Sequence, residues 1–254
     1  MLDPQGRSVL VTGAASGLGA ATAEHLVGLG MRVTLAGRRP ARVAEIADRL
    51  GPDALACVGD VTVDEDRRRM IDAAVEHGGG RLDGLVSNAG NMYRGPITDL
   101  GETELVDLFK VNVIAGMLLT GLAVPHLEST DGCVIFMGSV HTQRAFPGAS
   151  PYAATKGALE TLTGVLAAEL GPKGIRVSCV RPGAVPSEIN VRAGLATEAE
   201  NLERLEGLAP AHALGRIGTG ADIAEAIAHL LAAEWVTGSV FTVDGGLGLG
   251  VTNA

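Results

Sequence analysis

The strongest constraint on the fold of this chain is the alternation, along its whole length, of short apolar runs with longer stretches of helical pattern. A short run that is apolar throughout is typical of a strand buried on both faces. When a helix follows each strand, the chain returns across the sheet and the next strand lies parallel to the last. The runs predict strands at Ser8–Thr12, Arg32–Ala36, Leu55–Val58, Leu82–Ser87, Cys133–Gly138, Ile175–Val180 and Val240–Val243.

The segments between these strands carry the apolar spacing of helices. This order predicts an α/β fold, a Rossmann-like doubly wound parallel sheet of about seven strands with helices on both faces. The 254 residues are 46% hydrophobic and show no linker, repeat or low-complexity tract, so we expect one domain over residues 1–254. The predicted helices are at about 17–29, 41–50, 64–77, 102–124, 152–170 and 221–233.

One long segment, at about 184–214, has no strand pattern and separates the sixth strand from the last helix. Connections of this length in a compact domain are usually functional, so we expect a substrate lid. Its middle, 197–208, predicts a short helix in which Glu198, Glu200, Glu203 and Glu206 outnumber Arg204. Read as a solvated face, this acidic helix weakly disfavours a highly anionic substrate.

The charge balance excludes several kinds of partner. The net charge of −9 and the absence of a Lys/Arg run argue against nucleic acid or an anionic membrane surface. No signal peptide or long uninterrupted apolar stretch is visible. Cys57, Cys133 and Cys179 lie in apolar runs and form no zinc-ligand pattern, so we expect buried reduced thiols, no metal and a cytoplasmic location.

A glycine-spaced loop follows the first predicted strand. Its sequence, TGAASGLG at 12–19, includes Gly13, Ser16, Gly17, Leu18 and Gly19. Glycines at a strand–helix turn let the backbone approach a diphosphate, which then meets the positive end of the helix dipole. Although a purely structural turn is the alternative, the position after the first strand favours a dinucleotide site.

The end of the second predicted strand bears on the choice between NAD and NADP. An acidic residue there would bind the ribose 2′-hydroxyl and repel a 2′-phosphate. This chain has Gly37-Arg38-Arg39 instead, and a guanidinium can pair with a phosphate in bidentate fashion. We therefore expect NADP(H), with NAD(H) also allowed, and favour Arg38 over Arg39 as the ligand. Solvated arginines at a helix entry are the alternative.

Two further loops fall in register with the glycine loop. Asp60, before Val61, follows the third predicted strand and would accept a hydrogen bond from the adenine amino group, although a helix cap is the alternative. Asn88, Ala89 and Gly90 follow the fourth strand and place small residues beside the cofactor.

Tyr152 and Lys156 are the candidate catalytic pair. At positions i and i+4 of a predicted helix they share one face, and a neighbouring ammonium favours the phenolate form. The pair would give a phenol able to donate and accept a proton near neutral pH. Ser139, at the end of the fifth strand, would hold the substrate oxygen that the tyrosine protonates. A chance helical pair is the alternative.

With these residues in place, the whole chain resembles the short-chain dehydrogenase/reductase family, in its single-domain branch of about 250 residues. The match rests on motifs that fall in the expected strand–helix order: TGAASGLG at 12–19, DV at 60–61, SNAG at 87–90, VNV around Asn112, Ser139, YAATK at 152–156, RPG at 181–183 and VTGSVFTVDGG at 236–246.

The resemblance implies a role for each matching residue. Tyr152 would be the general acid in reduction and the base in oxidation. Lys156 would lower its pKa and hold the nicotinamide ribose, while Ser139 would polarise the carbonyl. Asn112 would interrupt its helix and hold a water that links Lys156 to solvent. Residues lining the nicotinamide would be Pro182, Gly183, Val185 and Ser187, the last standing where the family often has a threonine.

The resemblance implies an oxidoreductase that interconverts a small-molecule carbonyl and a secondary alcohol with NADP(H), either a ketoreductase, such as a 3-oxoacyl reductase, or an alcohol dehydrogenase. An NAD-dependent dehydrogenase of a secondary alcohol, sugar or steroid, and a non-catalytic dinucleotide-binding protein, stay open. It also implies a homotetramer or at least a homodimer.

The sequence says less about the substrate pocket. His141 would border the substrate and bond a polar group on it, or be a loop histidine bonded to backbone or water. Arg94 would anchor a substrate carboxylate, or be an exposed or interface arginine.

Overall fold

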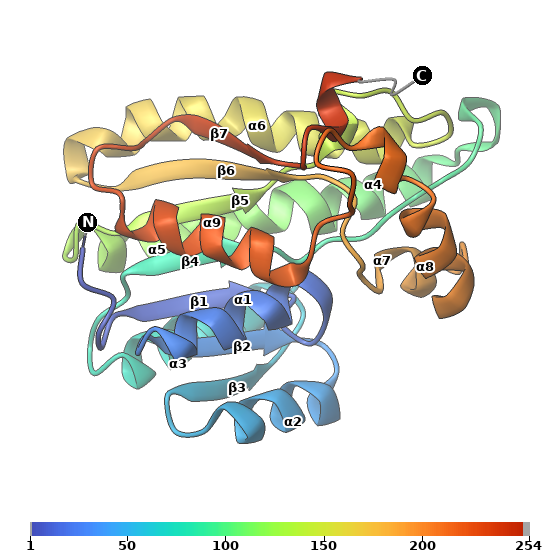
Figure 1. The fold of residues 1–254 in the computed structure, drawn as a ribbon. Coiled ribbons are helices and arrows are strands. Elements are labelled where there is room, and N and C mark those ends of the chain that lie inside the picture. The colour runs from blue at the N-terminus through green and yellow to red at the C-terminus, as the bar shows by residue number, and fades with distance from the viewer. Residues whose placement is uncertain (1, 251–254) are drawn as a thin grey trace.

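The computed structural model describes residues 2–250 and contains one parallel sheet of seven strands. The strands lie in the order β3-β2-β1-β4-β5-β6-β7 (Figure 1). This confirms the predicted Rossmann-like sheet, and each strand begins and ends within two residues of its expected position. The strands are β1 (Ser8–Thr12), β2 (Arg32–Gly37), β3 (Ala54–Val58), β4 (Gly84–Ser87), β5 (Cys133–Met137), β6 (Arg176–Pro182) and β7 (Ser239–Val243).

Helices cover both faces of the sheet with separate apolar cores. One face packs against α1 (Gly17–Gly28), α2 (Pro40–Leu50) and α9 (Gly220–Ala232), and α1 and α9 run side by side in Figure 1. The opposite face packs against α3 (Asp64–His77), α5 (Ala115–Glu128) and α6 (Ser150–Leu170). Burial on both faces explains why the strands read as continuous apolar runs.

The strand order reverses between β1 and β4. From β1 the chain moves outward through β2 to β3, then crosses to the other side of β1 and continues outward through β4 to β7. In open parallel sheets the loops at the carboxyl ends of the strands separate at such a reversal and leave a crevice. The loops after β1 and β4 are therefore the ones that border this crevice.

The expected helix at 102–124 is not one regular helix. It consists of α4 (Glu102–Phe109), a π-helical turn at Lys110–Ile114 and α5. The end at residue 124 was placed too early, because α5 continues through Pro125 and buries Leu127 completely in the core. A π turn inserts an extra residue into a helix and often marks a functional site. Here it carries Asn112, as the family resemblance implied.

The helical stretch Glu102–Glu128 is long and apolar enough to cross a membrane by length and composition alone. It packs instead against α3, α6 and the sheet. Several of its large apolar side chains are exposed to solvent, among them Val106, Met117 and Leu118, and Val165 of α6 is similarly exposed.

The expected lid segment contains two α-helices beyond the carboxyl ends of the strands (Figure 1). The longer one, α8 (Glu198–Glu206), matches the predicted helix and starts with a capping box, in which Thr197 and Glu200 bond each other's backbone N–H. The shorter one, α7 (Ile189–Arg192), was not predicted. Its single turn is too short to give an apolar period.

Candidate active site

The glycine loop after β1 has the backbone that the sequence predicted. Gly13 and Gly17 have φ values of +66° and +54°, in the left-handed region that favours glycine. A Cβ on Gly13 would lie 2.9 Å from the backbone of Ala89, and one on Gly19 would meet the carbonyl oxygen of Gly13. The loop can therefore approach a ligand and the β4 loop only without side chains at these positions.

Thr12, at the end of β1, ties this loop to the one after β4. Its Oγ1 accepts hydrogen bonds from the backbone N–H groups of Asn88 and Ala89, both at 3.0 Å. The Asn88 side chain returns a bond of 2.8 Å to the carbonyl oxygen of Thr12. From the sequence, Thr12 is recognisable only as part of the glycine motif, although a buried hydroxyl beside two strand ends needs such partners.

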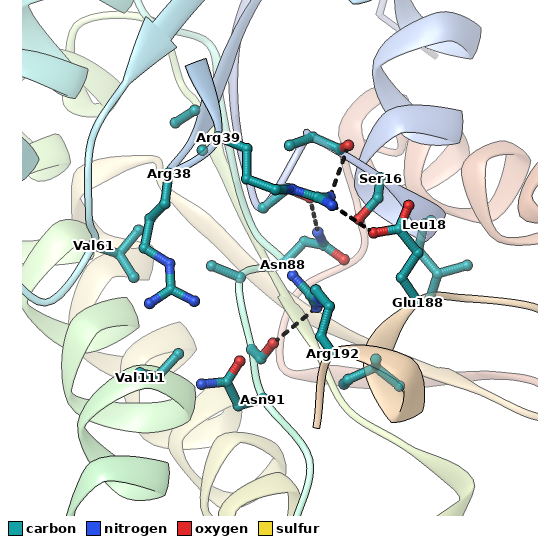
Figure 2. Close-up of a pocket in the computed structure, with 18 of the residues that line it drawn as sticks. Ser16, Leu18, Arg38, Arg39, Val61, Asn88, Asn91, Val111, Glu188 and Arg192 are labelled. Atoms are coloured by element: carbon teal, nitrogen blue, oxygen red, sulfur yellow. Dashed lines mark hydrogen bonds and ion pairs between the residues drawn. The ribbon is translucent and has the colours of Figure 1, made fainter. Parts of the chain in front are cut away.

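A cavity runs along this edge of the sheet (Figure 2) and collects most of the predicted cofactor residues. Gly19 does not line it, and acts through its close approach to Gly13. Pro182, Gly183 and Val185 line an adjoining cavity instead. The predicted residues on the wall of the first cavity are Gly13, Ser16, Gly17, Leu18, Arg38, Arg39, Asp60, Val61, Asn88, Ala89, Gly90 and Ser187.

Arg38 and Arg39 diverge in this cavity: Arg39 turns toward Glu188, whereas Arg38 extends on the side of Val61 (Figure 2). Arg39 Nη1 lies 2.8 Å from Glu188 Oε2, and Arg39 Nη2 donates to the carbonyl oxygen of Ala15. Arg38 makes one longer contact, 3.4 Å from Asp60 Oδ2. Arg38 is thus the less committed of the two cations.

Asp60 does not cap a helix. Its Oδ1 accepts bonds from the backbone and hydroxyl of Thr62, in the turn before α3. Burial acts to raise the pKa of Asp60, but the Thr62 bonds and Arg38 outweigh it, and the pKa lies below its usual range. The carboxylate is therefore charged and in place on the cavity wall.

The four predicted catalytic residues lie together at the carboxyl end of β5, and all are buried. Asn112 fixes the loop after β4: its Oδ1 accepts from the N–H of Asn91, and its Nδ2 donates to the Asn91 carbonyl oxygen and to Thr155 Oγ1. Lys156 Nζ donates to the carbonyl oxygen of Met137 at 2.7 Å. The expected water between Asn112 and Lys156 stays a prediction.

The expected lowering of the Tyr152 pKa is wrong for this structure. Burial raises the pKa of Tyr152 to about 12, although the Ser139 hydroxyl and the Arg94 charge oppose it. Burial also lowers the pKa of Lys156 to about 8, against the pull of Cys179 and Glu160. The ammonium lies 5.5 Å from the centre of the phenol ring and is bonded to the strand, and burial is the largest influence on both groups.

His141 and Arg94 form a chain of contacts that ends on Ser139. His141 Nδ1 lies 3.0 Å from Ser139 Oγ, and its Nε2 lies 3.3 Å from Arg94 Nη2. An arginine only donates, so Nε2 accepts and the ring proton is assigned to Nδ1, which donates to the serine. Burial, assisted by Arg94, lowers the pKa of His141 to about 4 and keeps the ring neutral at pH 7.

This chain of contacts orients the serine hydroxyl. Ser139 Oγ accepts from His141 Nδ1 and, at 3.3 Å, from the His141 backbone N–H. With its two lone pairs engaged, its own hydrogen is left to donate, and its bond with Tyr152 acts to lower the pKa of that phenol. The His141 ring is thus bonded to Ser139 and Arg94, two side chains that line the adjoining cavity.

A second cavity of about 320 Å³ opens in front of these residues. It shares Leu18, Asn88, Gly90, Ser187 and Ile189 with the first, so the two form one continuous hollow. Arg94 and His141 line it, and Arg94 is therefore a pocket residue and not an exposed one. Sequence reasoning missed several other lining residues: Phe146, Asn190, Leu205, Leu208 and Leu247.

The residues present fit a nicotinamide dinucleotide. The bare glycine backbone leaves room for a diphosphate, and Arg38 and Arg39 supply cations near the end of β2. Tyr152, Ser139 and Lys156 line the next cavity, where the reacting end of such a molecule would reach them. Cys57, Cys133 and Cys179 are buried and unpaired, as expected. Among residues 2–250, no cluster of His, Cys, Asp and Glu side chains could hold a metal ion.

Comparison with known proteins gives the same picture. Residues 13–248 match the family described as enoyl-(acyl carrier protein) reductase, a group of short-chain dehydrogenases/reductases. The chain is 38% identical to an uncharacterized oxidoreductase of Methylorubrum extorquens, over 96% of this chain and 98% of the relative. It is 36% identical to a putative ketoacyl reductase of the granaticin polyketide synthase from Streptomyces violaceoruber, over 96% of each chain.

Solved structures agree with these sequence matches. The 3-ketoacyl-(acyl-carrier-protein) reductase of Brucella melitensis, complexed with NADH, superposes with a TM-score of 0.87. It is 28% identical, and the alignment covers 96% of this chain and 99% of the reductase.

Proposed function

Because this chain belongs to the short-chain dehydrogenase/reductase family and is an oxidoreductase acting on CH–OH groups, we propose that it interconverts a ketone and a secondary alcohol with NADP(H). The observation that carries the proposal is the buried set Asn112, Ser139, Tyr152 and Lys156 beside a cavity continuous with the dinucleotide crevice. A ketoacyl-type reductase is the leading form.

The bound nicotinamide would supply the hydride to the carbonyl carbon. Ser139 donates its hydroxyl hydrogen to the carbonyl oxygen and fixes its position, and Tyr152 gives its phenolic proton to that oxygen as negative charge develops there. Lys156 would replace the proton on Tyr152 through the water predicted beside Asn112. Its pKa near 8 suits this work, because the ammonium gives up a proton readily near neutral pH.

NADP(H) is the proposed cofactor because the end of β2 has no acidic side chain and presents two arginines. Arg38 is the proposed ligand of the 2′-phosphate, since Arg39 is bonded to Glu188 and Ala15. An NAD-dependent dehydrogenase is the second candidate. The similarity to the reductase complexed with NADH favours the cofactor of this candidate. A glucose 1-dehydrogenase of Gluconobacter oxydans, 32% identical over 96% of this chain and 92% of the relative, favours a sugar as its substrate.

A homotetramer, or at least a homodimer, is part of the proposal. The exposed apolar side chains of α4, α5 and α6, Val106, Met117, Leu118 and Val165, support it because side chains of this kind favour burial against another copy. A cytoplasmic location remains our proposal, supported by three unpaired cysteines.

The test compares wild type with Tyr152→Phe on a panel of ketones and thioesters with NADPH and NADH. We expect Tyr152→Phe to lower turnover by about a hundredfold or more while cofactor affinity, measured by calorimetry, changes little. Undiminished turnover would contradict the proposed role of Tyr152. Cofactor binding by wild type without turnover of any compound would instead favour the non-catalytic dinucleotide-binding protein.

A further inference from the structure

The wall of the second cavity carries two arginines from distant parts of the chain. Arg94 lies in the loop after β4, and Arg204 lies on α8 of the lid segment. No Asp or Glu stands among the residues that line this cavity in the part of the chain that the structure describes. Two guanidinium groups, besides Lys156, therefore face a cavity that offers them no opposite charge.

Arg94 is held in place without being fully bonded. Its Nη2 contacts His141 Nε2, while its Nε is buried and has no hydrogen-bond partner among residues 2–250. Burial lowers the pKa of Arg94, and the charge of Arg204 acts in the same direction. A buried guanidinium N–H without a partner carries a free-energy penalty. A ligand that accepts a hydrogen bond from it would remove much of that penalty and bind more tightly.

Arg204 is aimed by a small network of amides. Asn201 Oδ1 accepts from Arg204 Nη2 at 3.3 Å and from Asn190 Nδ2 at 2.9 Å. Asn201 in turn donates from Nδ2 to the carbonyl oxygen of Ser187. Both asparagines are buried, so the network is fixed within the lid segment.

The phase of α8 corrects the expectation that an acidic lid disfavours an anionic substrate. Leu205, Leu208 just beyond the helix, and Arg204, which is also exposed to solvent, line the cavity. The four glutamates of the helix are exposed and do not line it. The acidic side chains of the helix therefore lie away from the cavity, and Arg204 is its one charged side chain on the cavity wall.

The remaining wall is mostly apolar and includes Met92, Phe146 and Leu247. A charged group in such surroundings is bound well only where its charge and hydrogen bonds are matched. The planar fork of an arginine matches a carboxylate in this way.

We propose that the substrate is an oxo acid with an apolar body, whose carboxylate is held by Arg94 and Arg204 while its ketone meets Ser139 and Tyr152. This inference rests on the proposed function and adds the substrate class to it. In the reverse direction the corresponding hydroxy acid is oxidised.

The test uses matched pairs of neutral and charged substrates. Aliphatic 2-oxo, 3-oxo and 4-oxo acids and their methyl esters are reduced by wild type, and kcat/KM is measured for each. We expect the acid to be favoured over its ester by about tenfold or more for at least one pair. Arg204→Met should reduce that ratio by a similar factor, mainly through KM of the acid, and Arg204→Lys should keep part of it.

Arg42→Met is the matched control, because Arg42 is an exposed arginine of α2 paired with Glu45 far from the cavity. It should leave the ratio unchanged. Because Arg204 lies on an exposed helix, we expect its variants to fold and to give interpretable kinetics even if Arg94→Met does not fold.

Two results would overturn the inference. One is Tyr152-dependent reduction of the esters without any preference for an acid, and the other is a preference that survives Arg204→Met; both leave the proposed function standing. If wild type turns over no acid or ester but does reduce other compounds of the ketone and thioester panel, the inference fails and the proposed function stands; if it turns over no compound of either set, both fail.

Discussion

The guanidinium of Arg39 lies 2.8 Å from the carboxylate of Glu188, and this contact joins the loop after β2 to the segment after β6 across the first cavity. The pair is partly exposed, so its direct contribution to folding is below about 1 kcal/mol. Its larger effect is on cofactor affinity, because Arg39 cannot bond Glu188 and the 2′-phosphate of NADP(H) equally well.

Glu188→Gln is therefore expected to raise the affinity for NADPH. The change leaves Arg39 free of a competing charge. The dissociation constant is expected to fall a few-fold for NADPH and by less for NADH. Calorimetric titration of both cofactors checks it. Glu45→Gln, which removes the exposed partner of Arg42, is the control. Equal gains for both cofactors would contradict a role for Arg39 near the 2′-phosphate.

Arg38→Asp is expected to reverse the cofactor preference. It places a like charge beside the proposed 2′-phosphate and an acceptor beside the ribose hydroxyls of NADH. The ratio of kcat/KM for NADPH to that for NADH should fall by about tenfold or more. A wild-type preference for NADH, or an unchanged ratio in the variant, would remove Arg38 from the assignment.

Thr12→Val is expected to destabilise the fold and weaken cofactor binding together. The substitution keeps the shape but leaves the N–H groups of Asn88 and Ala89 without their acceptor, at a cost of about 1–3 kcal/mol. Urea unfolding and cofactor titration measure the two effects. Thr22→Val is the matched control, since buried Thr22 only donates to a carbonyl oxygen of its own helix. A smaller loss of unfolding free energy for Thr12→Val than for Thr22→Val would contradict this role of Thr12.

We predict that the folded protein loses stability in acid because of His141. Its pKa lies at about 4, below the ordinary 6.5, so the unfolded chain binds the proton more readily than the folded one. Stability from this group is complete above pH 6.5 and falls as the pH drops toward 4, by about 2–3 kcal/mol. Urea unfolding across this range should show a shallower decline for His141→Gln. Identical slopes would mean that the ring is not neutral in the folded chain.

The apolar side of α5 predicts the oligomeric state. Leu118→Glu puts a charge on a surface that our proposal buries between copies, and should shift the protein toward the monomer in analytical ultracentrifugation. Val63→Glu, at an exposed valine before α3, is the control and should have no such effect. A wild type that sediments as a monomer would exclude this interface.

The positions of the strands and of the glycine loop could be predicted because they depend on local patterns. Ser8–Thr12 is buried on both faces, and Gly13 must take a left-handed turn, whatever surrounds them. The pKa of Tyr152 could not be predicted in this way, since it depends on how deeply the packed protein buries the phenol.

The position of Arg204 on the cavity wall could not be predicted from the sequence either. A helix with four glutamates reads as solvated on every side until the docking of α8 shows which residues face the cavity. The contact between His141 and Ser139 could have been predicted, because the two residues are close together on one loop. The second partner of the ring, Arg94, lies 47 residues away in the sequence and could not.

The wall shared by the two cavities has a thermodynamic consequence. Leu18, Asn88, Gly90, Ser187 and Ile189 border both hollows, so a molecule in one of them touches the boundary of the other. The affinities for the dinucleotide and for the carbonyl compound are then coupled, and each ligand changes the affinity for the other by the same factor. A dissociation constant measured for either ligand alone is therefore not the one that applies during turnover.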